Sequence, residues 1–334
     1  MKPIDVYITV DAEFNINDSL ENPEQRSPIG FPSMARVDNG RSHGLGFLLD
    51  TLNAVGLPGT FFVEVFCAHY FGPDEVKKMV CQIESAGDHD VQLHAHPCWR
   101  YFRDPDWRQT IRSIQKNDSW AGRGESALAL LNEAVDLFEV IVGRAPKVFR
   151  SGNLHVDADV HLALSALGVP ISSSVGLGLH EPASPALQRW MMPILSHGVL
   201  ELPVTSYSEP KLLGGERVKC LTVIGTAWPV IKSMLEWAYQ AQSAPVVLLT
   251  HASEFSVEQS GQSNEPQYLA NIRNQERFQA LCHYLKTEGN RFCVKRFSDI
   301  STDSYAFGTT ENKHYTAPRL AGISRAISNA WSRF

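Results

Sequence analysis

The chain alternates short apolar runs with longer segments of helical periodicity. Short runs rich in β-branched and aromatic residues are typical of buried strands, whereas apolar residues three and four positions apart are typical of helices. We predict strands at 4–10, 60–66, 90–94, 147–150, 169–172, near 200–205, near 220–225, at 245–250 and at 292–295. We predict helices from residue 45, from Pro73 to Gly87, and over 125–142, 157–167, 230–242 and 270–287. Such an alternation indicates an α/β protein with a parallel sheet or barrel in one domain.

Four of the apolar runs end in side chains that are suited to hydrolytic chemistry. In barrels of parallel strands surrounded by helices, reactive groups lie at the carboxyl ends of the strands. The strand-end residues are Asp11 with Glu13, His94 with His96, Arg150, and His251. If the strands lie side by side, these groups converge on one mouth of the barrel, and we predict a metal-assisted hydrolase.

Two pairs in this set have the spacing of metal ligands. Asp11 and Glu13 lie two residues apart, so in an extended segment they face the same way and repel unless a cation or proton lies between them. His94 and His96 share that spacing and predict a metal clip. Cys98 is a rival for one ligand position because a thiolate also binds zinc.

The two remaining residues suggest roles around the carboxylates. Arg150 ends a buried strand and needs a carboxylate partner, for which Asp11 is the candidate. His251 ends the most apolar strand and could supply a proton to a leaving group, with Glu254 orienting it. Two further histidines, His43 and His155, could line the mouth, and we leave them outside the core set.

Two polar loops are longer than usual connections and follow the first two motifs. The first covers 15–41, and the second covers 99–123 and carries five aromatic residues, Trp99, Tyr101, Phe102, Trp107 and Trp120. Loops of this length are often lids or binding walls. We expect the second loop to form a substrate wall, with aromatics folded over the barrel as the alternative.

Composition narrows the setting. The chain has 334 residues and a net charge of −6 without a basic block, which argues against nucleic acid as a partner. No run has the length of a membrane span, and the first residues lack the apolar stretch of a signal peptide. The six cysteines are dispersed, as in proteins of a reducing compartment. We therefore expect a cytoplasmic protein, and the sequence leaves its oligomeric state open.

The ordered motifs resemble those of a known family. They are Thr9-Val10-Asp11-Ala12-Glu13, Leu93-His94-Ala95-His96-Pro97, Phe149-Arg150-Ser151-Gly152 and Leu249-Thr250-His251. In this order they resemble the polysaccharide deacetylases with a NodB-homology domain, and more closely the branch with DxE and HxHP motifs. The segments Gly56–Phe62 and Arg296–Asp299 are also similar to segments of that family. The resemblance covers about residues 4–300.

The resemblance implies a distorted (β/α)7-type barrel, which we place over residues 1–300. The residue pattern predicts that a polar C-terminal tail over 301–334 follows, with an amphipathic helix near 320–331. The resemblance also implies a divalent metal ion, which we expect to be zinc, and removal of N-acetyl groups from an acetamido sugar. We expect a precursor of a surface polysaccharide as the substrate, and the aromatic residues of the 99–123 loop could stack on its sugar rings. Hydrolysis of another linear amide and a non-catalytic carbohydrate-binding barrel are the alternatives.

By position, the resemblance assigns a role to each strand-end residue. Asp11 matches the general base, Arg150 the residue that holds it, and His251 the general acid. Glu13 and His94 match metal ligands. The second histidine ligand is His96 in the HxHP branch, whereas the commoner HxxxH motif would place it at position 98, which is Cys98 here.

Overall fold

The computed structural model describes residues 1–211, 214–243, 245–259, 267–301, 305 and 312–318. Its main sheet has nine strands, and β12 to β9 run parallel to their neighbours. The order is β12 (Val246–His251), β1 (Ile4–Ala12), β4 (Thr60–Glu64), β5 (Asp90–Ala95), β6 (Val148–Ser151), β7 (Ile171–Ser172), β9 (Val199–Glu201) and the antiparallel β8 (Ile194–Ser196). The ninth strand, β15 (Phe292–Val294), pairs with the start of β1.

The sheet curls until its two sides meet. Beyond β9, the amide of Leu202 donates to the carbonyl of Ser172 on β7, and the amide of Thr205 donates to the carbonyl of Val247 on β12 at 3.0 Å. The segment after β9 therefore bridges both edges of the parallel array. The prediction of a distorted α/β barrel in a single domain is confirmed.

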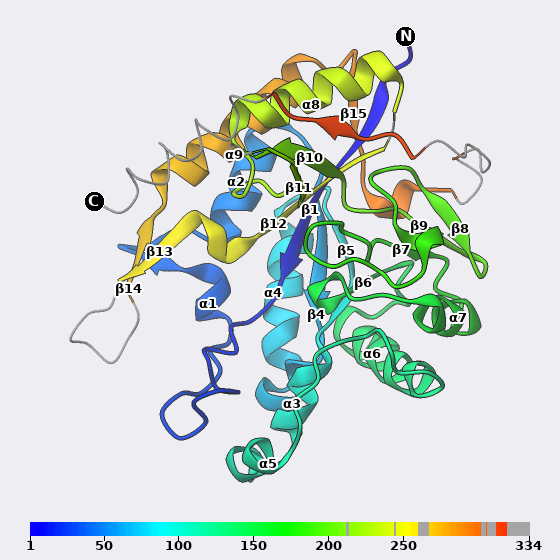
Figure 1. Cartoon of the computed structure of the whole chain (residues 1–334). Coiled ribbons are helices and arrows are strands. Elements are labelled where there is room, and N and C mark those ends of the chain that lie inside the picture. Colours follow the sequence, from blue (N-terminus) through cyan, green and yellow to red (C-terminus); the bar gives the residue numbers. More distant parts are fainter. Residues whose placement is uncertain (212–213, 244, 260–266, 302–304, 306–311, 319–334) are drawn as a thin grey trace.

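Helices surround this barrel in a continuous row. Consecutive contacts link α8, α9, α2, α4, α6 and α7, and Figure 1 shows α8 and α9 on one side of the sheet and α6 and α7 on another. The helices are α1 (Pro32–Ala35), α2 (Leu45–Val55), α3 (Ala68–Phe71), α4 (Pro73–Ala86), α5 (Trp107–Ser113), α6 (Ser126–Val142), α7 (Ala158–Ala166), α8 (Trp228–Ala241) and α9 (Ile272–Thr287). No helix in the described part of the chain has the length and apolar character needed to cross a membrane.

Three smaller sheets decorate the barrel. They are β2 (Val37–Asp38) with β3 (Arg41–Ser42), β13 (Ser256–Gln259) with β14 (Gln267–Ala270), and β10 (Ser206–Pro210) between β11 (Glu216–Cys220) and β16 (Tyr315–Thr316). The last pairing joins the described part of the tail to the barrel. The helix predicted near 320–331 lies outside the described residues.

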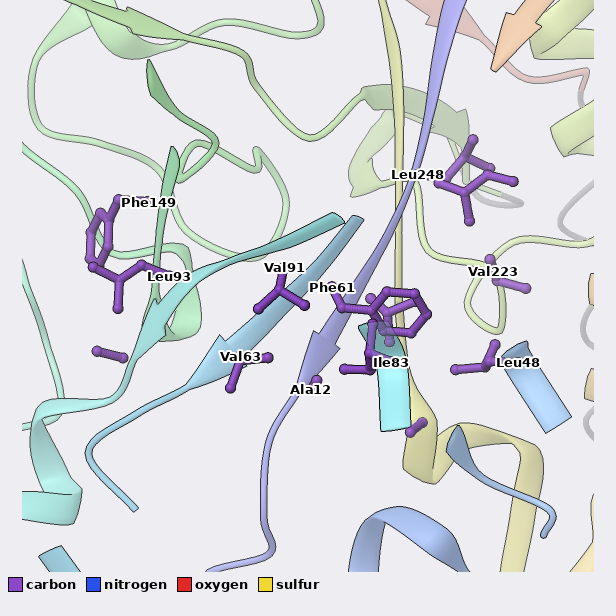
Figure 2. Close-up of a cluster of buried hydrophobic side chains, with 14 of the residues drawn as sticks. Ala12, Leu48, Phe61, Val63, Ile83, Val91, Leu93, Phe149, Val223 and Leu248 are labelled. Atoms are coloured by element: carbon purple, nitrogen blue, oxygen red, sulfur yellow. The ribbon is translucent and has the colours of Figure 1, made fainter. Parts of the chain in front are cut away.

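Alternation along each strand separates the core into two layers. Successive side chains of a strand point to opposite faces. Val6, Ile8 and Val10 of β1 belong to the large cluster between sheet and helices, whereas Tyr7 belongs to a second cluster inside the barrel. Figure 2 shows the outer cluster, to which Phe61, Val63, Val91, Leu93, Phe149 and Leu248 contribute from other strands. At about 25 cal/mol for each Å² of apolar surface buried, this layer is the main source of stability.

Candidate active site

The inward face of each strand carries the predicted chemistry. On β1, Asp11 has the same parity as Tyr7, which faces the barrel interior, and on β12 His251 has the parity of Val247. The parallel register places Asp11 beside His251 and His94 beside Arg150. All four residues lie at the carboxyl ends of their strands, so the structure brings together the residues that the sequence analysis selected.

Arg150 and Asp11 form a buried ion pair. The Arg150 side chain is fully buried, and its Nη1 lies 2.7 Å from Oδ1 of Asp11, as the sequence analysis expected. The guanidinium also donates to the hydroxyl of Thr9 and to the carbonyl and hydroxyl of Ser173, at 2.8 to 2.9 Å. The ring of Phe62 lies 4.0 Å below the guanidinium carbon. Hydrogen bonds and the Phe62 ring thus fix the position of the guanidinium, and the guanidinium in turn fixes the orientation of the Asp11 carboxylate.

Glu13 lies between two histidines. Its Oε2 is 3.2 Å from Nε2 of His96, and its Oε1 is 3.3 Å from Nε2 of His251. Burial raises the pKa of Glu13, but the charges and hydrogen bonds of the two imidazoles outweigh it, and the pKa lies well below its usual range. Glu13 is thus paired with two imidazoles, and a divalent metal ion can replace the protons that these imidazoles carry.

His94 presents an unpaired nitrogen to the same place. Its Nδ1 lies 2.8 Å from the backbone carbonyl of Arg150, and a carbonyl only accepts, so Nδ1 carries the proton. Its Nε2 is buried and has no hydrogen-bond partner among the described residues. Burial lowers the pKa of His94, which keeps the imidazole neutral. A neutral ring with Nδ1 bonded to a carbonyl and Nε2 free is the usual form of a metal-ligating histidine.

The other ring nitrogen of His96 has a partner that the sequence analysis missed. Nδ1 of His96 lies 2.7 Å from Oδ2 of Asp118, and Asp118 also accepts from the amide of Cys98 at 2.9 Å and from the side chain of Asn153 at 2.6 Å. Burial lowers the pKa of His96, but Glu13 and Asp118 raise it well above its usual value. Asp118 lies in the polar loop that follows the HxHP motif, and the pattern of hydrophobic and polar positions there does not distinguish it from its neighbours.

Glu64 is a second residue that sequence reasoning missed. It is fully buried at the end of β4, where one oxygen accepts from the amide of Phe66 at 2.6 Å and the other accepts from the amide of His96. Burial raises its pKa well above the usual value. A carboxylate inside an apolar strand was the available signal. Its contact fixes the backbone of the HxH segment.

The grouping of possible ligand atoms bears on the choice between His96 and Cys98 as the second ligand. Ligand atoms of Glu13, His94 and His96 all lie within 4.8 Å of one another. Cys98 belongs to a different group, with His96 and Asp118, and burial raises the pKa of its thiol to about 12. The donor set that includes both Glu13 and His94 therefore contains His96 and not Cys98.

A pocket of about 400 Å³ is bordered by Asp11, Glu13, His94, His96 and His251. The pocket is also lined by Asn153, Leu154, His155, Leu179 and Leu249. His155 thus reaches the mouth, whereas His43 is buried and its Nδ1 lies 3.4 Å from the side-chain amide nitrogen, Nε2, of Gln275. Glu254 holds Nδ1 of His251 at 3.0 Å, in the orienting position that the sequence analysis expected.

The buried aromatic residues of the second loop do not form a substrate wall. This loop folds into a 3-10 helix at Pro97–Arg103 and into α5. The side chains of Trp99, Phe102, Trp107 and Trp120 are at most 4% exposed and pack into the outer core. Large aromatic side chains that are buried against one another stabilise the fold through the apolar surface that they remove from water. The expectation that they stack on sugar rings is wrong, and the packing alternative holds.

Comparison with known proteins places this geometry in a fold. A protein from Mycobacterium smegmatis assigned as a polysaccharide deacetylase has a TM-score of 0.51 and 16% identity, covering 94% of this chain and 95% of its own. The chain has the polysaccharide deacetylase fold. The family resemblance of the motifs is thus confirmed at the level of the fold. No family model and no curated protein sequence matches the chain.

Proteins of other activities have the same fold. A GH57-type branching enzyme from Pyrococcus horikoshii has a TM-score of 0.50 and 10% identity, covering 95% of this chain and 72% of its own. An allantoinase has a TM-score of 0.50 and 13% identity, covering 91% and 92%. Because one fold serves several reactions, the reaction of this chain has to be argued from its site.

Proposed function

We propose that the protein is a metal-dependent deacetylase that removes the N-acetyl group from an acetamido sugar. The observation that carries the proposal is Nε2 of His94, which is buried, unpaired among the described residues and grouped with ligand atoms of Glu13 and His96. Two imidazoles and one carboxylate are the donor set of many catalytic zinc sites, so we expect zinc. The ion, when bound, would polarise an amide carbonyl and acidify water.

The protein's own groups supply the remaining steps. Asp11 is held by Arg150 at 2.7 Å and takes a proton from the attacking water. His251 gives a proton to the departing sugar amine. Burial lowers the pKa of His251, but hydrogen bonds with Glu13 and Glu254 raise it well above the usual value, so the ring is protonated near neutral pH. The products are acetate and a free amino sugar.

The spatial order of the groups supports this division of roles. Nε2 of His251 lies 4.0 Å from Oδ2 of Asp11, and both residues line the same pocket, so base and acid can both reach one substrate amide. Leu249 and Leu179 also line the pocket and provide apolar surface beside the polar groups. As the sequence analysis expected, we infer a precursor of a surface polysaccharide as the substrate.

Elemental analysis and an acetate-release assay test the proposal together. We expect about one zinc per chain and acetate release from an acetamido sugar; neither, despite added metal, would favour a carbohydrate-binding barrel. Asp11→Asn should keep metal and lose turnover by about 10²-fold or more, the usual scale for a lost general base. Surviving activity would remove Asp11 from the mechanism.

Three further variants test the ligands. We expect His94→Ala and His96→Ala each to lose bound zinc, while Cys98→Ala keeps it. Zinc content is measured after dialysis against a fixed free-zinc concentration, and circular dichroism checks that each variant is folded. Full zinc content in His96→Ala, or zinc loss in Cys98→Ala, would assign the second ligand to Cys98.

A further inference from the structure

A second pocket opens beside the proposed metal centre. It has a volume of about 380 Å³ and shares Glu13, His96 and Asn153 with the first pocket. Its far side is lined by Asn15, Ser33, Arg36 and Ser253 among others. A substrate bound at the metal centre can therefore extend into this space, and the residues of its far side would contact a neighbouring part of the substrate.

Arg36 is the residue of this pocket whose surroundings indicate an anionic ligand. It is 7% exposed, and it donates to the carbonyl of Ser33 at 2.9 Å and to the hydroxyl of Ser256 at 3.2 Å. Its guanidinium lies 4.8 Å from the ring centroid of Tyr268. None of these partners is a carboxylate, and in the described part of the chain Arg36 forms no ion pair. Buried arginines are rarely left without a counter-charge, because an unpaired buried charge destabilises a protein.

The backbone at Arg36 is also held in an unfavourable state. Arg36 ends α1 with φ 46° and ψ 59°, a left-handed conformation in which glycine or asparagine is the usual residue. The side chain is fixed between α1 and the β13–β14 hairpin, which lie side by side in Figure 1. The exposed carboxylate of Glu258 acts on this cation from a distance but does not pair with it. A rigidly held cation that lines a pocket and lacks an ion-paired carboxylate is preorganised for an anion from solution.

The acidic residues of the same pocket already have partners. Asp118 accepts from His96, Cys98 and Asn153, and Glu13 lies between His96 and His251. Both therefore have cationic or hydrogen-bonding partners of their own. Among the residues that line the pocket, Arg36 is the one with a permanent positive charge.

We propose that Arg36 forms a subsite for an oxyanion, a carboxylate or a phosphate, that the acetamido substrate carries next to its reacting sugar. This inference rests on the proposed function, and it names the substrate class as an anionic acetamido sugar. A planar guanidinium can bind either oxyanion through two parallel hydrogen bonds, so the two sources are separated by experiment.

Binding of three matched sugars tests the subsite without turnover. The probes are neutral N-acetylglucosamine, N-acetylmuramic acid with a carboxylate, and N-acetylglucosamine 1-phosphate. Dissociation constants are measured by calorimetry on the full chain without added metal. We expect at least one anionic probe to bind about tenfold or more tightly than the neutral sugar, the scale of a charged hydrogen bond. The probe that shows the preference identifies the oxyanion.

Three arginine variants then assign the preference. In Arg36→Met the preference for the anionic probe should fall below about threefold, and Arg36→Lys should keep part of it because the charge remains while the fork is lost. Arg277→Met is the control: Arg277 is a half-buried arginine outside both pockets that donates to the backbone carbonyls of Val223 and Ile224. It should keep the full preference. Thermal unfolding confirms that each variant is folded.

The outcomes separate this inference from the proposed function. Acetate release by the zinc-loaded wild type, without any preference for anionic sugars, would leave the deacetylase proposal standing and overturn the subsite. An anion preference that Arg36→Met abolishes, without acetate release from any probe, would keep the subsite and overturn the deacetylase. A preference that survives in Arg36→Met would also overturn the assignment to Arg36.

Discussion

The pair between Arg150 and Asp11 allows a quantitative test of how the site is built. Replacing Arg150 by methionine keeps a long unbranched side chain but removes the charge and four hydrogen bonds, to Thr9, to Asp11, and to the carbonyl and hydroxyl of Ser173. Asp11 is 4% exposed, so water does not replace the lost guanidinium. The variant therefore leaves the buried Asp11 carboxylate without its ion-pair partner at 2.7 Å, and its remaining cationic neighbour is the His251 imidazole, 4.0 Å away.

The expected cost follows from that environment. Removing one partner of a buried ion pair typically lowers the free energy of unfolding by about 3–5 kcal/mol. A chain of 334 residues has an unfolding entropy of about 0.7 kcal/mol/K near its melting temperature. The melting temperature of Arg150→Met should therefore fall by about 4–7 °C, measured by calorimetry without added zinc.

A double-mutant cycle separates the pair from the rest of the network. Asp11→Asn removes the carboxylate charge, and in the double variant neither charge is left unpaired. We expect the double variant to be at least about 2 kcal/mol more stable than the two single losses would predict by addition. Additive losses, or a loss below about 1 kcal/mol in Arg150→Met, would refute the view that Arg150 neutralises a buried Asp11.

Two further variants probe the histidines. Burial lowers the pKa of His251, but hydrogen bonds with two carboxylates, one of them Glu254, raise it well above the usual value. Glu254→Gln should lower that pKa and move the basic limb of the kcat/KM profile to lower pH. A basic limb that does not move would remove His251 as the general acid. A β-carbon on Gly152 would lie 2.6 Å from the His96 ring, so Gly152→Ala should weaken zinc binding by about tenfold or more. Gly289→Ala, whose β-carbon meets nothing closer than 3.4 Å, is the control, and equal zinc affinity in both variants would contradict the argument.

The sequence predicted the barrel and the strand-end residues because both depend on short-range patterns. Each of the four apolar runs that carry the site is a strand whose last inward residue is polar, and parity along the strand decides that Asp11 and His251 face the barrel interior. The neighbour relations follow from parallel register, which places Asp11 beside His251 and His94 beside Arg150. Alternation and register therefore suffice to assemble this part of the site.

The parts that were not predicted depend on how loops return to the barrel. Asp118 reaches His96 from 22 positions away in a loop without periodicity, so its contact has no local signal. The aromatic residues of the same loop belong to the core. Polar residues stand beside them in the sequence, so the hydrophobic pattern does not indicate that they are buried. Besides Glu64, another missed feature did have a signal: Asn39 and Gly40 have φ of 47° and 77° and join β2 to β3, as Asn-Gly turns commonly do.

The contrast between the two carboxylates carries the strongest argument about mechanism. Asp11 is paired with a guanidinium, which stays protonated at any physiological pH and cannot be displaced by a metal ion. Glu13 is paired with imidazoles, whose protons exchange readily for a divalent cation. If the roles were reversed, the base would compete for the metal and the ligand would be locked to an arginine. The partners of each carboxylate therefore support Asp11 as the proton acceptor and Glu13 as the metal ligand.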